Sequence, residues 1–318
     1  MKILTARISE DSSEAPHLIT LFGLGLIGSA ILSELELSHA SCLTDIPTRW
    51  SDLSELNESI TQVEDFLDRT CSAYPAGRRY TISVVWSAGE AGFAAPEGRT
   101  VQEFLNFQAV LALGDRLASR GESRAVRFFL VSSAGGLFEG QKNVSDKDIP
   151  TPLRPYGNLK LQQESALLTR GTFASCFIYR PSSVYGHSSK GRTGLISALL
   201  SNGLKRQVTS IYGAPTTLRD FVSANDIGRF ITRDVLATQI QANRNPTFLV
   251  SGKPSSIFEV IRIIEGFLGR KLYVQYDLDY SNALDNTYSR QTISEGWATR
   301  TLTEGIQDVF LNLTQHCL

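Results

Sequence analysis

Residues 17–28 read HLITLFGLGLIG, and this stretch decides the fold. Its first six residues form an apolar run rich in strand formers, and Gly23, Gly25 and Gly28 follow with the spacing G-x-G-x-x-G. A helical pattern comes next, and a second short strand is predicted over residues 41–45. Strand, glycine turn, helix and strand make up the first half of a doubly wound α/β unit.

The alternation of strands and helices continues to residue 180. Strands are predicted over 80–86, 126–131 and 173–179, and helices over 51–69, 100–120 and 157–169. Beyond Pro181 the sequence becomes turn-rich, and its predicted strands and helices are shorter.

This pattern predicts an α/β fold, a Rossmann-type doubly wound parallel sheet with a smaller mixed α/β C-terminal part. We interpret residues 1–16, which end in the polar segment SEDSSEAP, as an N-terminal extension. Residues 17–180 are predicted to form a dinucleotide-binding domain. Residues 181–318 are predicted to form most of a substrate-binding part that is interleaved with this domain.

Composition excludes several classes of protein. The 318 residues are 42% hydrophobic and 20% charged, with a formal net charge of -1. A disordered chain would be less apolar or more highly charged, and a nucleic-acid binder driven by bulk electrostatics would be basic. The four cysteines are widely spaced, and the four histidines lack metal-ligand spacing. We therefore expect a cytoplasmic protein with reduced cysteines, no metal site and no nucleic-acid partner.

The apolar stretch 17–32 is too short and too rich in glycine for a comfortable membrane span. Acidic residues precede it where a signal peptide would carry basic ones. We therefore expect no membrane partner.

The glycine spacing predicts a phosphate-binding turn. A helix N-terminus, here at Leu26 and Ile27, presents unpaired N–H groups and the positive end of its dipole. Gly23 permits the tight turn, Gly25 lets a phosphate approach the backbone, and Gly28 lets the helix pack on the strand.

Asp45 ends the second strand, 20 residues after Gly25. A carboxylate there can accept hydrogen bonds from both hydroxyls of the adenosine ribose, and it repels a 2′-phosphate. This favours NAD as the cofactor, although Arg49 lies close enough to leave NADP open.

Tyr156 and Lys160 carry the second chemical signal. Their i, i+4 spacing places a phenol and an ammonium on one helix face. A nearby ammonium stabilises phenolate and lowers the tyrosine pKa, so Tyr156 can donate and accept a proton. The preceding strand ends in Ser132 and Ser133, where a hydroxyl can share the substrate oxygen.

Several segments in register resemble the extended short-chain dehydrogenase/reductases, specifically the nucleotide-sugar epimerase/dehydratase group. The similarity covers roughly residues 17–313. Besides the glycine turn and Ser132-Ser133, it rests on PLRPYGNLKLQQE, RPSSVYG, TLRDFVSANDIGRFI and GWATRTLTEGIQDVF.

The resemblance implies a role for each matching residue. Tyr156 would be the catalytic acid/base, and Lys160 would lower its pKa and hold the nicotinamide ribose. Arg219 would pair with the phosphates of a nucleotide-sugar substrate, and Ser183 stands where relatives often have a substrate-binding Asn. Further cofactor contacts are implied for Ala88, Gly89, Asn106, Pro181 and Val184. The family also implies a homodimer, formed through helices 100–120 and 157–169.

The sequence also departs from the family. Phe22 stands where the family's first glycine falls, and no third strand with an adenine-contacting Asp is visible over residues 46–79. The family's catalytic hydroxyl position falls on Ala134, so we assign that role to Ser133, which would also contact substrate.

The segment Ser133-Ala134-Gly135 disfavours one reaction. Family 4,6-dehydratases resemble Thr-Asp-Glu here and use the acids to eliminate water. Our first hypothesis is therefore an NAD(P)-dependent 4-epimerase of nucleotide sugars, which acts through a 4-keto intermediate. An NAD(P)H-dependent reductase of nucleotide-linked 4-keto sugars is the alternative, and a low-turnover dinucleotide-binding scaffold is the third hypothesis.

Overall fold

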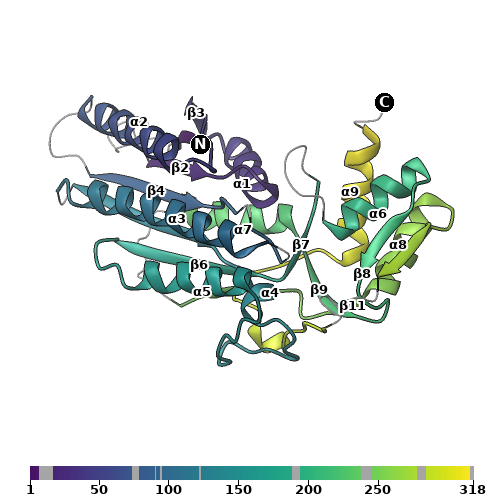
Figure 1. The fold of residues 1–318 in the computed structure, drawn as a ribbon. Helices are drawn as coiled ribbons and strands as arrows, with labels where there is room; N and C mark the ends of the chain where they lie inside the picture. The colour runs from purple at the N-terminus through teal and green to yellow at the C-terminus, as the bar shows by residue number, and fades with distance from the viewer. Residues whose placement is uncertain are drawn as a thin grey trace.

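The computed structural model describes residues 1–6, 17–73, 79–89, 91–93, 95–121, 123–187, 194–237, 245–277 and 284–315. Within these ranges, seven strands form one central sheet in the order β10-β6-β5-β4-β2-β1-β3 (Figure 1). Every neighbouring pair is parallel except the two that involve β1. The strands are β1 (Lys2–Ala6), β2 (His17–Phe22), β3 (Ser41–Asp45), β4 (Tyr80–Trp86), β5 (Arg124–Val131), β6 (Ser175–Pro181) and β10 (Thr247–Leu249).

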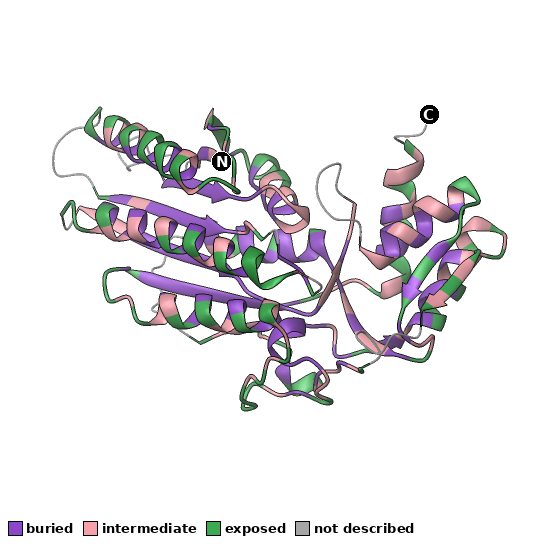
Figure 2. Ribbon diagram, viewed as in Figure 1, coloured by how far each residue is buried: buried purple, intermediate pink, exposed green. Residues whose placement is uncertain are grey.

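Helices cover both faces of the sheet, and each face has its own apolar core. Helices α2 (Leu53–Ser72), α3 (Glu97–Ala118) and α5 (Pro155–Leu168) share one core with the sheet. Helices α1 (Leu26–Leu37) and α7 (Ala224–Leu236) share the other. Figure 2 shows buried strands between helices whose outer faces are exposed. The predicted doubly wound α/β fold is confirmed.

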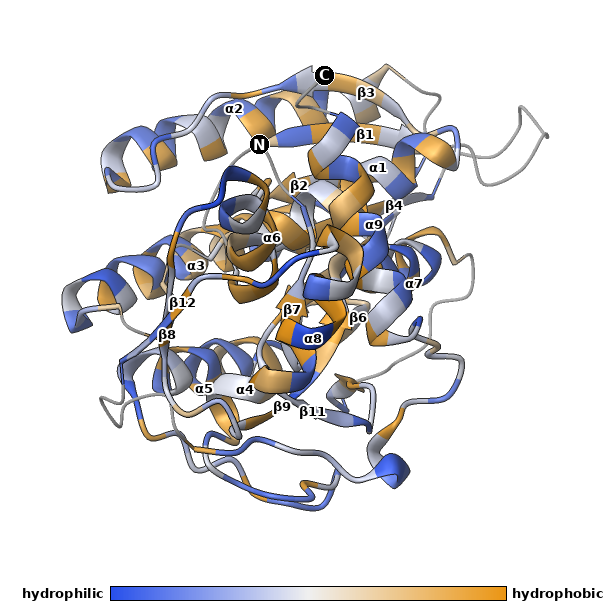
Figure 3. Ribbon diagram, turned by 90° about the vertical axis from the view of Figure 1, so that its right-hand side faces the viewer, coloured by the Kyte–Doolittle hydropathy of each residue, from blue (hydrophilic) through white to orange (hydrophobic). Residues whose placement is uncertain are grey.

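Three predicted strands, 17–22, 41–45 and 80–86, have the bounds that the structure gives to β2, β3 and β4. All six residues of β2 are buried, as expected for a strand with helices on both faces. Figure 3 shows the same separation, with hydrophobic residues along inner strands such as β6 and hydrophilic ones on outer helices such as α2.

The prediction of an N-terminal extension over residues 1–16 is wrong for residues 2–6. These residues form β1, which pairs antiparallel with β2 on one side and with β3 on the other. Ile3 and Leu4 are fully buried, one in each of the two cores that flank the sheet. This pairing places β3 two strands away from β2, and α2 follows β3 directly.

The second half of the chain builds a smaller lobe, on the right in Figure 1. Helices α6 (Leu195–Lys205), α8 (Ile257–Leu268) and α9 (Leu302–Gln315) share a third core beside the two-stranded sheet of β8 (Thr209–Tyr212) and β12 (Val274–Asp277). A three-stranded sheet lies between the lobes and contains β7 (Ser183–Tyr185), β9 (Leu218–Ser223) and β11 (Pro254–Ser256). Between these elements the chain returns to the large lobe, where α7 packs on α1 and β10 pairs with β6.

Among the described helices, none is both long enough and apolar enough to cross a membrane. The apolar stretch 17–32 forms β2, the glycine turn and the first part of α1, where the apolar cores of the sheet account for its composition.

Candidate cofactor and active site

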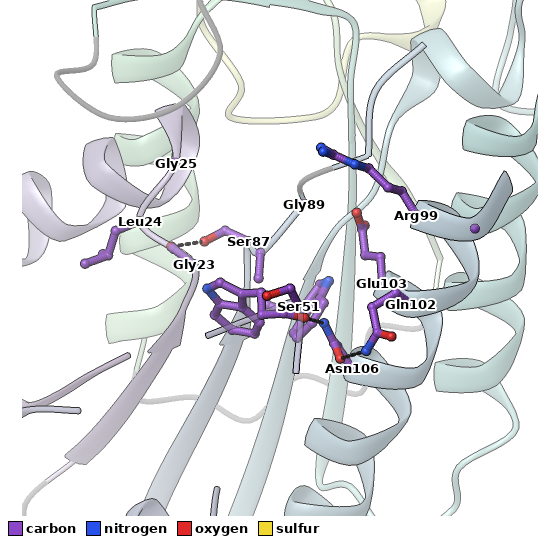
Figure 4. A pocket seen from close by; sticks show the side chains of 14 residues that line it. Gly23, Leu24, Gly25, Ser51, Ser87, Gly89, Arg99, Gln102, Glu103 and Asn106 are labelled. Carbon is purple, nitrogen blue, oxygen red and sulfur yellow. Dashed lines mark hydrogen bonds between the residues drawn. The ribbon is translucent and has the colours of Figure 1, made fainter. Parts of the chain in front are cut away.

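A cavity of about 740 Å³ opens where β2 and β4 end (Figure 4). Open α/β sheets bind ligands in this crevice, beyond the carboxyl ends of their parallel strands. The volume falls within the usual range for small-molecule and cofactor sites. The lining residues come from the glycine turn, the β3–α2 connection, the end of β4 and α3, namely Gly23, Leu24, Gly25, Trp50, Ser51, Trp86, Ser87, Ala88, Gly89, Gly98, Arg99, Gln102, Glu103 and Asn106.

The three glycines of the turn differ in what an added side chain would meet. Gly23 has a φ of 91°, and a Cβ on it would lie 2.4 Å from the Ala88 backbone. A Cβ on Gly28 would lie 2.0 Å from the Gly23 carbonyl oxygen. Gly25 differs, because it has an ordinary φ of -72° and a Cβ on it would meet no atom within 4 Å. The space over Gly25 therefore belongs to the cavity.

Gly25 is also the N-cap of α1, and a glycine has no side chain with which to cap the first turn. The first turn, which begins at Leu26 and Ile27, contains no acidic residue. The turn therefore presents backbone N–H groups and the positive end of the helix dipole, which suits an anion such as a pyrophosphate.

Two tryptophans, which we call the aromatic wall, also line the cavity. The Trp50 and Trp86 rings meet edge to face, with centroids 5.8 Å apart. Asn106 holds this wall in place, because its Nδ2 donates to the Trp50 carbonyl at 2.7 Å and its Oδ1 accepts from Gln102 Nε2 at 2.9 Å. Trp86 Nε1 is buried and makes no hydrogen bond within the described residues. The sequence predicted Asn106 at the cofactor but missed Trp50 and Ser51, which only the β3–α2 connection brings there.

Asp45 lies apart from this cavity and is absent from its described lining. Its carboxylate accepts from Lys2 Nζ at 3.0 Å and lies 3.9 Å from the Met1 ammonium, and its side chain is 54% exposed. Strand β1 causes this displacement, because it takes the place beside β2 where a doubly wound unit has its second strand.

We expect Asp45→Asn to change the dissociation constant of NAD by no more than about twofold. The exposed pair with Lys2 contributes about 0–1 kcal/mol, so the fold should tolerate the change. Calorimetric titration with NAD tests this, with Gly25→Ala as the positive control. A loss of tenfold or more in affinity, the size expected for a lost charge-assisted hydrogen bond, would instead place Asp45 on the ribose.

Tyr156 and Lys160 meet on one face of α5, as the spacing predicts. Lys160 Nζ lies 5.7 Å from the centroid of the Tyr156 ring, which packs against Phe93 at 5.5 Å between centroids. Helix α5 approaches the segment after β5 very closely, because a Cβ on Gly157 would lie 2.2 Å from the Gly136 carbonyl oxygen. This contact fixes the phenol beside the end of β5.

Lys160 connects the tyrosine to the cavity. Its Nζ donates to Glu103 Oε1 and to Gln163 Oε1, both at 3.1 Å. Glu103 lines the cavity, and a Cβ on the neighbouring Gly89 would lie 3.7 Å from Lys160 Nζ. The predicted residues Ala88, Gly89 and Lys160 therefore come together at one end of the cavity.

The two serines after β5 have different partners. Ser132 Oγ donates to Glu164 Oε1 at 2.5 Å, and the same carboxylate is paired with Arg180. Ser133 Oγ accepts from the Gly136 N–H at 3.1 Å and caps the short helix α4 (Ala134–Leu137). Ser132 therefore belongs to a buried ionic network, and Ser133 remains our predicted catalytic hydroxyl.

The predicted substrate residues Ser183 and Arg219, and the predicted cofactor residues Pro181 and Val184, lie where the chain passes between the lobes. Pro181 ends β6, and Ser183 and Val184 lie in β7. Arg219 lies in β9, and its guanidinium donates to the Leu284 carbonyl. Burial lowers the pKa of Arg219.

Glu139 is the next acid along the chain after the Ser133-Ala134-Gly135 segment. Its carboxylate pairs with Arg154 Nε at 2.7 Å, and burial raises its pKa. The negative charge of Glu139 also acts on Arg219. The guanidinium groups of Arg154 and Arg219 therefore both interact with the one buried carboxylate of Glu139.

A family model described as "NAD dependent epimerase/dehydratase family" matches residues 23–246. The chain belongs to this family. The resemblance that the motifs indicated is therefore confirmed.

One curated relative is a "Putative UDP-glucose 4-epimerase" of Methanocaldococcus jannaschii, which is 29% identical over 188 residues. The match spans 56% of this chain and 60% of that protein. Among solved structures, MoeE5 in complex with UDP-glucose and NAD has a TM-score of 0.69 at 22% identity, covering 94% of this chain and 99% of that one. UDP-glucose 4-epimerase of Thermotoga maritima has a TM-score of 0.70 at 17% identity, with the same coverage.

NAD is the cofactor of this family, and the residues present fit it. The uncapped start of α1 and the open space over Gly25 suit the pyrophosphate. Trp50 and Trp86 also line the cavity, and the buried Trp86 Nε1 makes no hydrogen bond within the described residues. Asp45, the acid predicted to hold the adenosine ribose, is absent from the described lining of this cavity.

Proposed function

We propose that the protein is a nucleotide-sugar 4-epimerase. The observation that carries this proposal is the position of Tyr156 and Lys160 at the end of the NAD cavity, where Lys160 contacts the cavity residue Glu103. A phenol beside a buried ammonium is suited to proton exchange with a sugar hydroxyl.

In the proposed mechanism, NAD supplies a hydride acceptor when it is bound. The Tyr156 phenolate takes the proton of the sugar 4-hydroxyl as that carbon loses its hydride, and Lys160 stabilises the negative charge on the phenolate before this step. The 4-keto sugar turns in the site. Tyr156 then returns the proton when the carbonyl is reduced on its other face.

The arrangement of acids argues against dehydration. Ser133, Ala134 and Gly135 carry no carboxylate. The next acid along the chain, Glu139, is buried in its pair with Arg154. A base for removing a sugar C–H proton and an acid for the departing hydroxyl are therefore not present in this segment.

We further propose that the substrate is a sugar linked to a nucleoside diphosphate. Arg219 and Arg154 place positive charge on the substrate side of Tyr156, where it would offset that of the diphosphate. The names of the relatives point to a UDP sugar. A homodimer through α3 and α5, and a cytoplasmic location, stay predictions.

Incubation of the purified protein with UDP-glucose, UDP-galactose and their N-acetyl forms, with NAD present, tests the proposal. We expect interconversion of a C4 pair with no net change in NADH. Net oxidation of added NADH by a 4-keto sugar, without epimer formation, would favour the reductase. Absence of turnover with every sugar nucleotide would overturn the proposal.

A further inference from the structure

A buried ionic cluster joins α3 to α5 at the end of the cavity. It contains Glu103, Lys160 and Gln163, whose exposed fractions are 5%, 4% and 0%. Glu103 Oε1 accepts from Lys160 Nζ at 3.1 Å and from Gln163 Nε2 at 3.3 Å. Glu103 Oε2 accepts from the Ala91 N–H at 2.9 Å. One oxygen of this carboxylate is thus bound to α5, and the other is bound to the backbone at Ala91.

We infer that Glu103 is a positioning residue that holds the Lys160 ammonium and sets how strongly its charge acts on Tyr156. The inference rests on the proposed function, since it concerns the same phenol. Lys160 alone would offer an uncompensated positive charge to the phenolate. Glu103 sets a negative charge 3.1 Å from Lys160 Nζ, and both side chains are buried.

The position of Glu103 in the cavity wall distinguishes it from an ordinary salt bridge. Figure 4 shows its carboxylate directed towards Gly89 rather than along α3. A Cβ on Gly89 would lie 3.6 Å from Glu103 Oε1 and 3.7 Å from Lys160 Nζ, so the pair lies directly behind that glycine. Any ligand that reaches Gly89 therefore meets both charges together.

Glu103 also fixes where Lys160 can be. A lysine side chain has many rotamers, and its ammonium reaches one position reproducibly only when partners hold it. Glu103 and Gln163 bind Nζ from two helices, and Gln163 is itself bound to Glu103. Moving either charge of a buried pair away from its partner leaves the other charge uncompensated. The cluster therefore favours the single arrangement in which Glu103 and Lys160 stay paired.

The charges around Tyr156 give the sign of the expected effect. Lys160 on α5 favours the phenolate, and Glu103 on α3 offsets the charge of Lys160. Arg154 lies over the Phe93 ring that packs on Tyr156, and its charge is paired with Glu139. Arg99, one turn before Glu103, also lines the cavity. Removing the negative charge of Glu103 therefore favours the phenolate, and catalysis that needs this phenolate should persist to lower pH.

Two substitutions separate charge from position. Glu103→Gln keeps the shape and removes the charge, so the acid limb of the pH profile of kcat/KM should move down by about 0.5–1 pH unit. Glu103→Asp keeps the charge but shortens the side chain, so it should leave the limb in place and lower the plateau by about tenfold. Glu97→Gln, an exposed carboxylate on the same helix, is the control and should change neither.

A second readout does not depend on turnover. Ultraviolet titration of tyrosinate, taken as the difference from Tyr156→Phe, follows the phenol with no substrate present. We expect the midpoint of this difference titration to fall in Glu103→Gln and to stay in Glu97→Gln. If no sugar nucleotide turns over, the proposed function fails while this titration still tests Glu103.

The inference is overturned if Glu103→Gln leaves both the kcat/KM profile and the tyrosinate midpoint unchanged and only lowers the thermal unfolding temperature. Glu103 would then be a structural tie between α3 and Ala91. Should Glu103→Gln fail to fold, Glu103→Asp decides the matter, because an unchanged plateau rate in that variant contradicts the positioning role.

Discussion

Tyr156→Phe should lower turnover of the sugar nucleotide by about a thousandfold or more while NAD affinity and the thermal unfolding temperature stay close to those of the wild type. The substitution removes only the phenolic oxygen, and general acid–base catalysis by a placed side chain is worth about 10²–10⁴-fold. The ring itself packs on Phe93 and lies against Gly136, contacts that a phenylalanine keeps.

Single-turnover and steady-state assays with the sugar nucleotide measure the loss, and calorimetric titration measures NAD binding. Tyr212→Phe is the matched control, because Tyr212 is 58% exposed and lies in β8 of the smaller lobe. A Tyr156→Phe variant that retained a tenth of the wild-type rate would remove Tyr156 from the chemistry. A variant that lost NAD as well would indicate a role in binding.

Local patterns in the sequence were sufficient for the parts of the site that one element builds alone. The apolar run of β2 and the glycine spacing gave the phosphate turn, because strand burial and turn sterics act over a few residues. The i, i+4 spacing likewise placed Lys160 beside Tyr156 without knowledge of any other element.

Contacts between segments that are distant in the sequence cannot be predicted from such local patterns. Nothing near residues 2–6 signals that they pair with both β2 and β3, and this pairing moves Asp45 away from the cavity. Glu103 lies 57 residues before Lys160, and α3 offers other acids at other positions. A helical periodicity predicts that a helix forms, but it does not predict which residue on a second helix will meet it.

Alanine substitutions at two glycines of the same turn should have different effects, one on stability and the other on NAD binding. Gly28→Ala should destabilise the fold by about 2–4 kcal/mol, because its Cβ would lie 2.0 Å from the Gly23 carbonyl oxygen and overpacked interiors must shift to relieve such contacts. Gly25→Ala should leave the unfolding temperature near that of the wild type, because its φ of -72° suits alanine and no atom lies within 4 Å of the new methyl group.

NAD binding should nevertheless fall by at least about tenfold in Gly25→Ala, since the space over this residue is where the backbone admits the pyrophosphate. Urea unfolding and calorimetric titration measure the two effects separately. Gly266→Ala is the control, because it is exposed on α8 and meets no neighbour, so it should bind NAD normally and gain up to about 1 kcal/mol from helix propensity. Undiminished NAD affinity in a folded Gly25→Ala variant would show that the pyrophosphate does not lie over this turn, and the cavity would then need another explanation.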